Sequence, residues 1–260
     1  MEKVFFHNSK GLRLVGMLHI PKNETKTIIV MAHGFTGDKD EWGRFVKAVE
    51  EFCRAGFAVF RFDFSGSGES DDTSLTVEKE VDDLRCALEY VKNKGFSKIG
   101  LLGFSLGGLI CARVCTPEIG TMVLWAPLTA RLPKHTWRSR FTPEQLRELK
   151  EKGYITKTRD KGVRKRYIID AQILRDMESV NQRELLSKLK CPVLIIHGSK
   201  DDAVSIEDSK NALKYLPQGS KLEVILGGEH KLSNHLDRVI SLSLNWFRRY
   251  LSGSCVQQRE

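Results

Sequence analysis

The chain has 260 residues, of which 41% are hydrophobic and 29% are charged. This balance excludes a disordered chain and suits one globular domain with a large core and room for an insertion. No apolar stretch approaches the length that crosses a membrane, and the first residues lack the apolar core of a signal peptide. We therefore expect a protein that does not insert into membranes.

The cysteines are scattered, at Cys53, Cys86, Cys111, Cys115, Cys191 and Cys255. They form no Cys-x-x-Cys pair, and metal-ligand spacing is absent. Cys111 and Cys115 share one helical face, which indicates two small core residues rather than a disulfide. We expect a reduced, cytoplasmic protein with no metal or cofactor.

The net charge of +9 is concentrated in one segment, because residues 131–176 hold 14 Lys and Arg against 6 Asp and Glu. A basic patch attracts anionic substrates, membranes or nucleic acid. The same charge pattern is also typical of an ordinary solvated helical face. No nucleic-acid-binding motif accompanies the patch, so no nucleic-acid partner is expected.

Short apolar segments alternate with helical patterns along the chain. The expected strands are Val4–Phe6, Leu12–Ile20, Thr27–Ala32, Ala58–Phe62, Ile99–Gly103, Thr121–Trp125, Val193–His197 and Lys221–Leu226. The expected helices are Asp40–Ala55, Val77–Asn93, Leu106–Cys115, Ile206–Tyr215 and Asn234–Leu251. This alternation indicates an α/β fold with a mostly parallel, eight-stranded sheet and helices on both faces. The turn Ser9-Lys10-Gly11 allows the first two strands to pair as an antiparallel hairpin.

One long region breaks the alternation. Residues 128–188 are highly charged and show no clear strand, and Thr142-Pro143-Glu144 is a typical helix start. Such an insertion after a central strand usually serves as a lid or binding segment. We expect a core formed by residues 1–127 and 189–260 and a helical cap formed by residues 128–188. The basic segment then lies close to the substrate entrance.

The pentapeptide Gly103-Phe104-Ser105-Leu106-Gly107 lies between an expected strand and an expected helix. A Gly-x-Ser-x-Gly sequence in that context is the pattern of a nucleophile elbow, whose turn leaves no room for bulky neighbours of the serine. The turn lifts the serine hydroxyl above the sheet in a strained backbone conformation. Ser105 is therefore the candidate nucleophile.

A serine nucleophile needs a base and an acid that orients the base. The loop after the strand Val193–His197 carries Asp201 and Asp202, and its spacing favours Asp201 as the acid. The loop after Lys221–Leu226 carries His230 behind two glycines, with His235 as the weaker competitor. Serine, acid and histidine follow the chain order expected for an elbow serine. His197 is interpreted as a strand-end residue that fixes the turn.

Two glycine-containing loops complete the predicted site. After Ala32, the turn at Gly34 brings the backbone N–H of Phe35 back towards the elbow, where it joins that of Leu106 as an oxyanion hole. The loop of residues 63–70 lacks the lysine of a P-loop and the third glycine of a dinucleotide fingerprint. We interpret the latter as a structural loop.

Taken together, these motifs resemble the α/β-hydrolase superfamily. The sequences that carry the resemblance are His33-Gly34-Phe35-Thr36-Gly37, Arg61 through Ser70, Gly103 through Gly108 and His197-Gly198-x-x-Asp201. The chain is most similar to the small feruloyl/cinnamoyl esterases and their serine-aminopeptidase-like neighbours. The resemblance implies Asp201 as acid, His230 as base, and Phe35 and Leu106 as oxyanion donors.

The resemblance also implies a function and a place for the substrate. In that group the insertion caps the active site and contacts the acyl part of the ester, so Trp137, Gln145, Tyr154 and Tyr167 are candidate substrate-binding residues. We expect a carboxylesterase that acts on a small-molecule ester through an acyl-enzyme and needs no cofactor. The alternatives are a thioesterase or aminopeptidase on the same triad and a non-catalytic ligand-binding protein.

Overall fold

The computed structural model describes residues 1–114 and 116–252. Within them the main sheet has eight strands, in the order β1-β2-β4-β3-β6-β7-β10-β11. These strands are β1 (Glu2–His7), β2 (Arg13–His19), β3 (Thr27–Ala32), β4 (Ala58–Asp63), β6 (Lys98–Phe104), β7 (Ile119–Trp125), β10 (Val193–Gly198) and β11 (Lys221–Ile225). β1, β2 and β4 pair antiparallel, and all the other neighbours pair parallel. The expected hairpin and the mostly parallel sheet are therefore confirmed.

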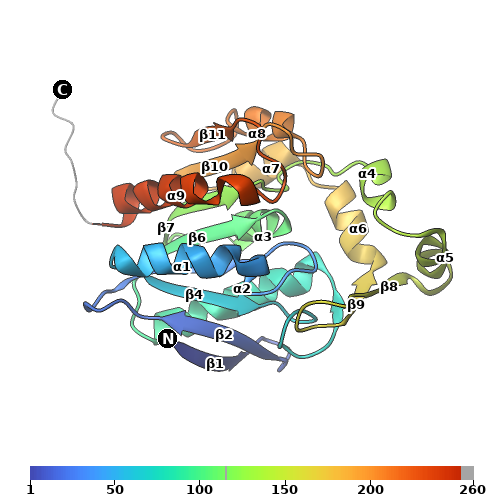
Figure 1. The fold of residues 1–260 in the computed structure, drawn as a ribbon, viewed down its shortest axis with the longest axis horizontal. Coiled ribbons are helices and arrows are strands. Elements are labelled where there is room, and N and C mark those ends of the chain that lie inside the picture. Colours follow the sequence, from blue (N-terminus) through green and yellow to red (C-terminus); the bar gives the residue numbers. More distant parts are fainter. Residues whose placement is uncertain (115, 253–260) are drawn as a thin grey trace.

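Helices cover both faces of the sheet (Figure 1). One face carries α1 (Arg44–Arg54) and α9 (Leu236–Leu251), and the other carries α2 (Val77–Asn93), α3 (Leu106–Val114) and α8 (Ile206–Ala212). In β3, Ile28 and Val30 pack on the side of α2 and α3, whereas Ile29 and Met31 pack on the side of α1 and α9. Because successive side chains point to opposite faces, a strand covered on both sides must be apolar throughout.

The insertion contains helices, as expected, and also strands that the sequence did not indicate. Its helices are α4 (Lys134–Arg138), α5 (Pro143–Lys152), α6 (Ala171–Glu178) and α7 (Gln182–Leu186). Between them β8 (Tyr154–Thr158) and β9 (Arg166–Asp170) form an antiparallel pair, and β9 also pairs with β5 (Ser74–Leu75) of the core. The burial in these strands is limited to Ile155 of β8 and to Tyr167 and Ile169 of β9, and polar or charged residues stand beside them. A pattern based on apolar runs therefore misses both strands.

The helix expected at Asp40–Ala55 is broken near its start. A short 3-10 turn, η1 (Glu41–Gly43), precedes α1, and Trp42 and Gly43 have φ values of +57° and +86°. Glu41 and Trp42, which lie at this break, both line the cavity described below. A second 3-10 turn, η2 (Ser233–His235), precedes α9.

The helix after the elbow ends at Val114, and Cys115, with which Cys111 was expected to share a face, lies outside the described residues. In the part of the chain that the structure describes, no helix combines the length and the apolar character needed to cross a membrane.

Candidate active site

The pentapeptide Gly103 to Gly107 forms the turn between β6 and α3. Ser105 has a φ of +53°, in the left-handed region that residues with a side chain rarely adopt. A Cβ atom on Gly103 would lie 2.6 Å from the carbonyl oxygen of Gly107, and one on Gly107 would collide with the backbone of Ala32 and His33. Glycine on each side of the Phe-Ser-Leu segment is therefore a steric requirement of the turn.

Loops from two other strands bring an imidazole and a carboxylate to Ser105. The loop after β11 carries His230, whose Nε2 lies 3.0 Å from Ser105 Oγ. The loop after β10 carries Asp201, whose Oδ2 lies 2.8 Å from His230 Nδ1. The structure thus joins these three residues in one chain of hydrogen bonds. Within the described residues, no hydrogen bond connects His235 to Ser105.

The carboxylate of Asp201 is fully buried and held from several sides. Its Oδ1 accepts the backbone N–H groups of Ala203 at 2.8 Å and Val204 at 2.9 Å. Burial alone raises the pKa of Asp201, but hydrogen bonds from His197 and His230 outweigh burial and hold that pKa well below its usual range. Asp201 is therefore a fixed negative charge beside His230. Asp202 is exposed and makes no hydrogen bond or ion pair with the described residues.

His197 at the end of β10 does more than terminate the strand. Its Nε2 lies 3.0 Å from Asp201 Oδ2 and 3.1 Å from the carbonyl oxygen of Val204, and its Nδ1 lies 2.6 Å from Ser209 Oγ. The ring is fully buried. His197 therefore holds both the turn and the carboxylate. The contact between His197 and Asp201 was not predicted from the sequence, although the spacing of four residues across a tight turn is consistent with it.

Phe35 and Leu106, the expected oxyanion donors, both line the cavity that contains Ser105 and His230. β3 and β6 are neighbours, with Ala32 opposite Gly103, so the two loops leave the sheet side by side. A Cβ on Gly34 would lie 2.9 Å from the ring of Phe104, which shows how closely the first loop approaches the elbow. Backbone N–H groups from both loops are therefore within the same small region of the site.

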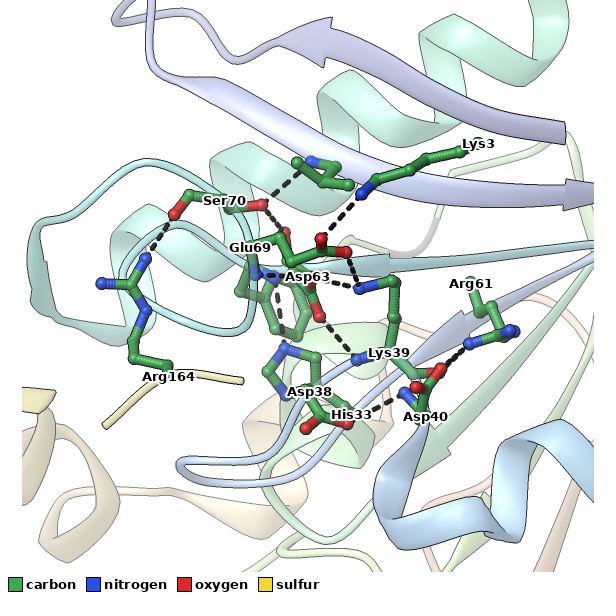
Figure 2. A network of polar contacts seen from close by, with 12 residues as sticks. Lys3, His33, Asp38, Lys39, Asp40, Arg61, Asp63, Glu69, Ser70 and Arg164 are labelled. Atoms are coloured by element: carbon green, nitrogen blue, oxygen red, sulfur yellow. Dashed lines mark hydrogen bonds and ion pairs between the residues drawn. The ribbon is translucent and has the colours of Figure 1, made fainter. Parts of the chain in front are cut away.

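A polar network holds the first of these loops (Figure 2). Asp63 Oδ1 accepts the backbone N–H of Lys39 at 2.7 Å, and Lys39 Nζ lies 2.8 Å from Asp63 Oδ2 and 2.7 Å from Glu69. His33 Nε2 accepts the backbone N–H of Phe64 at 3.1 Å. Hydrogen bonds from Lys3 and Lys39 lower the pKa of Glu69 to about 2. The loop of residues 63–70 therefore fastens the loop of residues 33–41.

In this network Lys39 pairs with a buried carboxylate and with a more exposed one, and replacing each of them should change the stability to a different extent. Lys39 and Asp63 are only 7% and 0% exposed, whereas Glu69 is 32% exposed. Asp63→Asn leaves the buried Lys39 with one counter-charge, so we expect a loss of about 3 kcal/mol in the free energy of unfolding. Glu69→Gln is the matched control and should cost below about 1 kcal/mol. Urea unfolding measures both, and equal midpoints for the two variants would contradict this account.

A cavity of about 260 Å³ separates the triad from the insertion. Of the four substrate-binding candidates in the insertion, Trp137 lines this cavity, and Gln145, Tyr154 and Tyr167 do not. Gln145 completes a capping box with Thr142 at the start of α5, and the buried Tyr167 packs against Arg159. The apolar lining that the sequence did not indicate comes from Leu128, Leu132, Phe141, Met177 and Val204.

Within the described residues, no three His, Cys, Asp or Glu side chains gather in an arrangement able to hold a metal ion. The polar groups around Ser105 instead provide a nucleophile, a base and an ionised carboxylate. Such a set can abstract a proton from the serine hydroxyl and return it to a leaving group.

One protein-family model matches most of the chain. The family model for serine aminopeptidase, S33 (Hydrolase_4), matches residues 23–237. "Serine hydrolase BPHL" of Homo sapiens is 29% identical over 196 residues, which cover 68% of this chain and 64% of that protein. "Palmitoyl-protein thioesterase ABHD10, mitochondrial" of Bos taurus is 32% identical over 165 residues, which cover 60% and 52%. The matches thus span between about half and two thirds of these relatives.

Solved structures match a larger share of this chain and of their own chains. Est1E of Butyrivibrio proteoclasticus, solved with ferulic acid bound, superposes with a TM-score of 0.77 at 25% identity, covering 96% of this chain and 99% of that one. An esterase domain from Rhodothermus marinus gives a TM-score of 0.72 at 23% identity and matches the fold, with 96% and 98% coverage. Since the family model covers most of the chain, the protein belongs to the serine aminopeptidase S33 family (Hydrolase_4) of the α/β-hydrolase superfamily.

Proposed function

We propose that this protein is a serine hydrolase that cleaves carboxylic esters through an acyl-enzyme. The observation that carries the proposal is the continuous chain from Ser105 Oγ to His230 at 3.0 Å and from His230 to Asp201 at 2.8 Å. A complete triad also argues against the alternative of a non-catalytic receptor, which has no need of an oriented base.

In this mechanism His230 Nε2 takes the proton of Ser105 as Oγ attacks the ester carbonyl carbon. The backbone N–H groups of Phe35 and Leu106 stabilise the oxyanion that forms. The tetrahedral intermediate collapses, the bond to the alcohol breaks, and His230 gives its proton to the departing oxygen. A water that His230 activates then attacks the acyl-enzyme, releases the acid and restores Ser105. Asp201 holds the imidazole in the required tautomer and stabilises its positive charge.

We propose that residues 128–188 cap the core formed by residues 1–127 and 189–260 and that the acyl group lies beneath the cap. The cavity volume of about 260 Å³ is just below the range of roughly 300–1,000 Å³ that is usual for small-molecule sites, which favours a short or single-ring acyl group. Trp137 and Phe141 are the aromatic residues that the insertion contributes to its wall, and Phe35, Trp42 and Phe104 are those of the core.

The thioesterase relative and the serine aminopeptidase family suggest two other acyl-transfer reactions, the cleavage of thioesters and of aminoacyl peptides. An aminopeptidase must bind the ammonium group of its substrate. Within the described residues Glu41 is the one carboxylate that lines the cavity, and it already accepts from Gly34 N–H and Arg44. Arg140, Lys157 and Arg159 line the same cavity and repel an ammonium group. Charge therefore favours an ester or thioester over an aminoacyl substrate.

The test is a substrate panel at fixed pH, with 4-nitrophenyl butyrate, a butyryl thioester and leucine 4-nitroanilide. We expect the oxygen ester to give a kcat/KM at least about tenfold above that of the thioester and no measurable anilide cleavage. Ser105→Ala protein supplies the background rate. Faster turnover of the thioester or of the anilide would contradict the assignment to oxygen esters.

A further inference from the structure

The cavity above Ser105 has a strongly basic wall. Arg140, Lys157 and Arg159 of the insertion and Lys231 beside His230 all line it. Lys157 and Arg159 are half-buried, whereas Arg140 and Lys231 are exposed. The surplus positive charge of the sequence is therefore partly directed at the reacting group, rather than confined to a solvated helical face.

None of these four side chains forms an ion pair with a carboxylate of the described residues. The guanidinium of Arg159 donates to Thr36 Oγ1 at 2.5 Å and to the hydroxyl of Tyr167 at 3.5 Å, both neutral groups. Arg140 donates to the carbonyl oxygen of Ala203 at 3.1 Å. Arg164 of the same insertion differs, because it pairs with Asp72 at 2.6 Å.

Lys157 is the least compensated of these cations. Its Nζ lies 5.9 Å from the centre of the Phe141 ring, a contact that is weaker than a salt bridge. Burial, and then repulsion by Arg159 and Arg140, lowers the pKa of Lys157 below the ordinary lysine value. Like charges gathered in a cavity raise the free energy of the unliganded site, and an anion placed among them relieves that cost.

We propose that the ester substrate carries a carboxylate, which binds Lys157 and Arg159 while the ester carbonyl lies at Ser105. This inference rests on the proposed esterase function and adds the charge of its substrate. The carboxylate can belong to the acid, as in a monoester of a dicarboxylic acid, or to the alcohol. Arg159 suits it because a guanidinium binds a carboxylate with two parallel hydrogen bonds.

The test compares pairs of esters in which one member carries a carboxylate and the other carries a neutral group in its place. For the acyl side, mono-4-nitrophenyl adipate is paired with 4-nitrophenyl hexanoate. For the alcohol side, 4-acetoxybenzoate is paired with 4-acetoxybenzamide. In the native protein we expect the charged ester of at least one pair to have a kcat/KM about tenfold or more above its neutral partner, a ratio that falls as salt rises. The pair with the larger ratio identifies the side that carries the carboxylate.

Two variants and a control link that ratio to the named residues. Lys157→Met and Arg159→Gln should each lower the ratio of charged to neutral kcat/KM by about fivefold or more. Lys161→Met removes the same charge from an exposed position of the same insertion that does not line the cavity, so it should leave the ratio unchanged. A native ratio of one or less for both pairs, or a ratio that Lys157→Met and Arg159→Gln do not alter, would overturn the inference.

A binding measurement keeps this inference separable from the esterase proposal. Calorimetry on Ser105→Ala protein compares adipate with its neutral diamide, and it needs no turnover. We expect adipate to bind about tenfold more tightly, with the difference reduced by Lys157→Met. If neutral esters are hydrolysed through Ser105 but charge brings no preference, the inference fails and the esterase proposal stands. If no ester is hydrolysed, the proposed function fails and calorimetry alone decides the inference.

Discussion

Ser105→Ala should lower kcat for 4-nitrophenyl butyrate by about 10⁴-fold or more, because the attacking oxygen is removed while the rest of the site stays in place. The substitution deletes one heavy atom, the Oγ, at a half-buried position and keeps the Cβ. Initial rates at saturating substrate give the effect, and the far-ultraviolet circular dichroism spectrum and the urea midpoint check that the fold is unchanged.

The matched control for this variant is Ser233→Ala, which removes a hydroxyl from η2 near His235, outside the cavity. Its kcat should stay within about twofold of the native value. A Ser105→Ala protein that keeps a tenth or more of the native rate would eliminate the serine mechanism. Residual hydrolysis at the level of a general-base background would be consistent with the serine mechanism.

Replacing the two adjacent carboxylates separately should give very unequal results. Asp201→Asn should lower kcat by about 10³- to 10⁴-fold, because an amide donates to His230 Nδ1 and favours the wrong imidazole tautomer. Asp202→Asn should change kcat by less than about threefold, since an exposed side chain without partners in the described chain contributes little.

The two variants are isosteric and remove the same charge one residue apart, so each controls for the other. Steady-state kinetics on a single neutral ester separate kcat from KM, and KM should stay nearly constant in both variants because neither carboxylate lines the cavity. A larger loss of kcat for Asp202→Asn would show that Asp201 is not the acid of the triad. Equal losses would point to a structural role of the whole loop.

The parts of the fold that follow from local patterns agree with the sequence. β3 and α2 begin and end at the predicted residues, Thr27–Ala32 and Val77–Asn93. A strand buried on both faces must be apolar throughout, and Thr76 caps α2 by accepting the N–H of Lys79. These features depend on residues that are close together in the chain.

Ser105, Asp201 and His230 were also chosen as candidates from local context. Each follows the end of an expected strand, and the carboxyl ends of parallel strands lie along one edge of a sheet. The hydrogen-bond distances among Ser105, His230 and Asp201 add geometry that a sequence cannot supply.

The structure of the insertion was harder to predict from the sequence, because it depends on contacts between residues that are far apart in the chain. β9 pairs with β5, about ninety residues earlier in the chain by the pairing of Leu75 with Ile169, so no local window contains both strands. Tyr154 and Tyr167 were chosen for their aromatic rings. Tyr167 is buried in the small sheet and Tyr154 is half-buried, and neither residue lines the cavity. Residue type alone does not tell which face of such a strand meets the substrate.

The most direct measurement is the site of covalent modification by a fluorophosphonate probe. We expect one adduct per chain in the intact mass spectrum, located on Ser105 by peptide mapping. The adduct should be absent in Ser105→Ala and should form more slowly in Asp201→Asn. An excess of hydrolysable ester present during labelling should slow the reaction, because ester and probe compete for Ser105. A protein that stays unmodified, or an adduct on any other serine, would contradict the claim that Ser105 is an activated nucleophile.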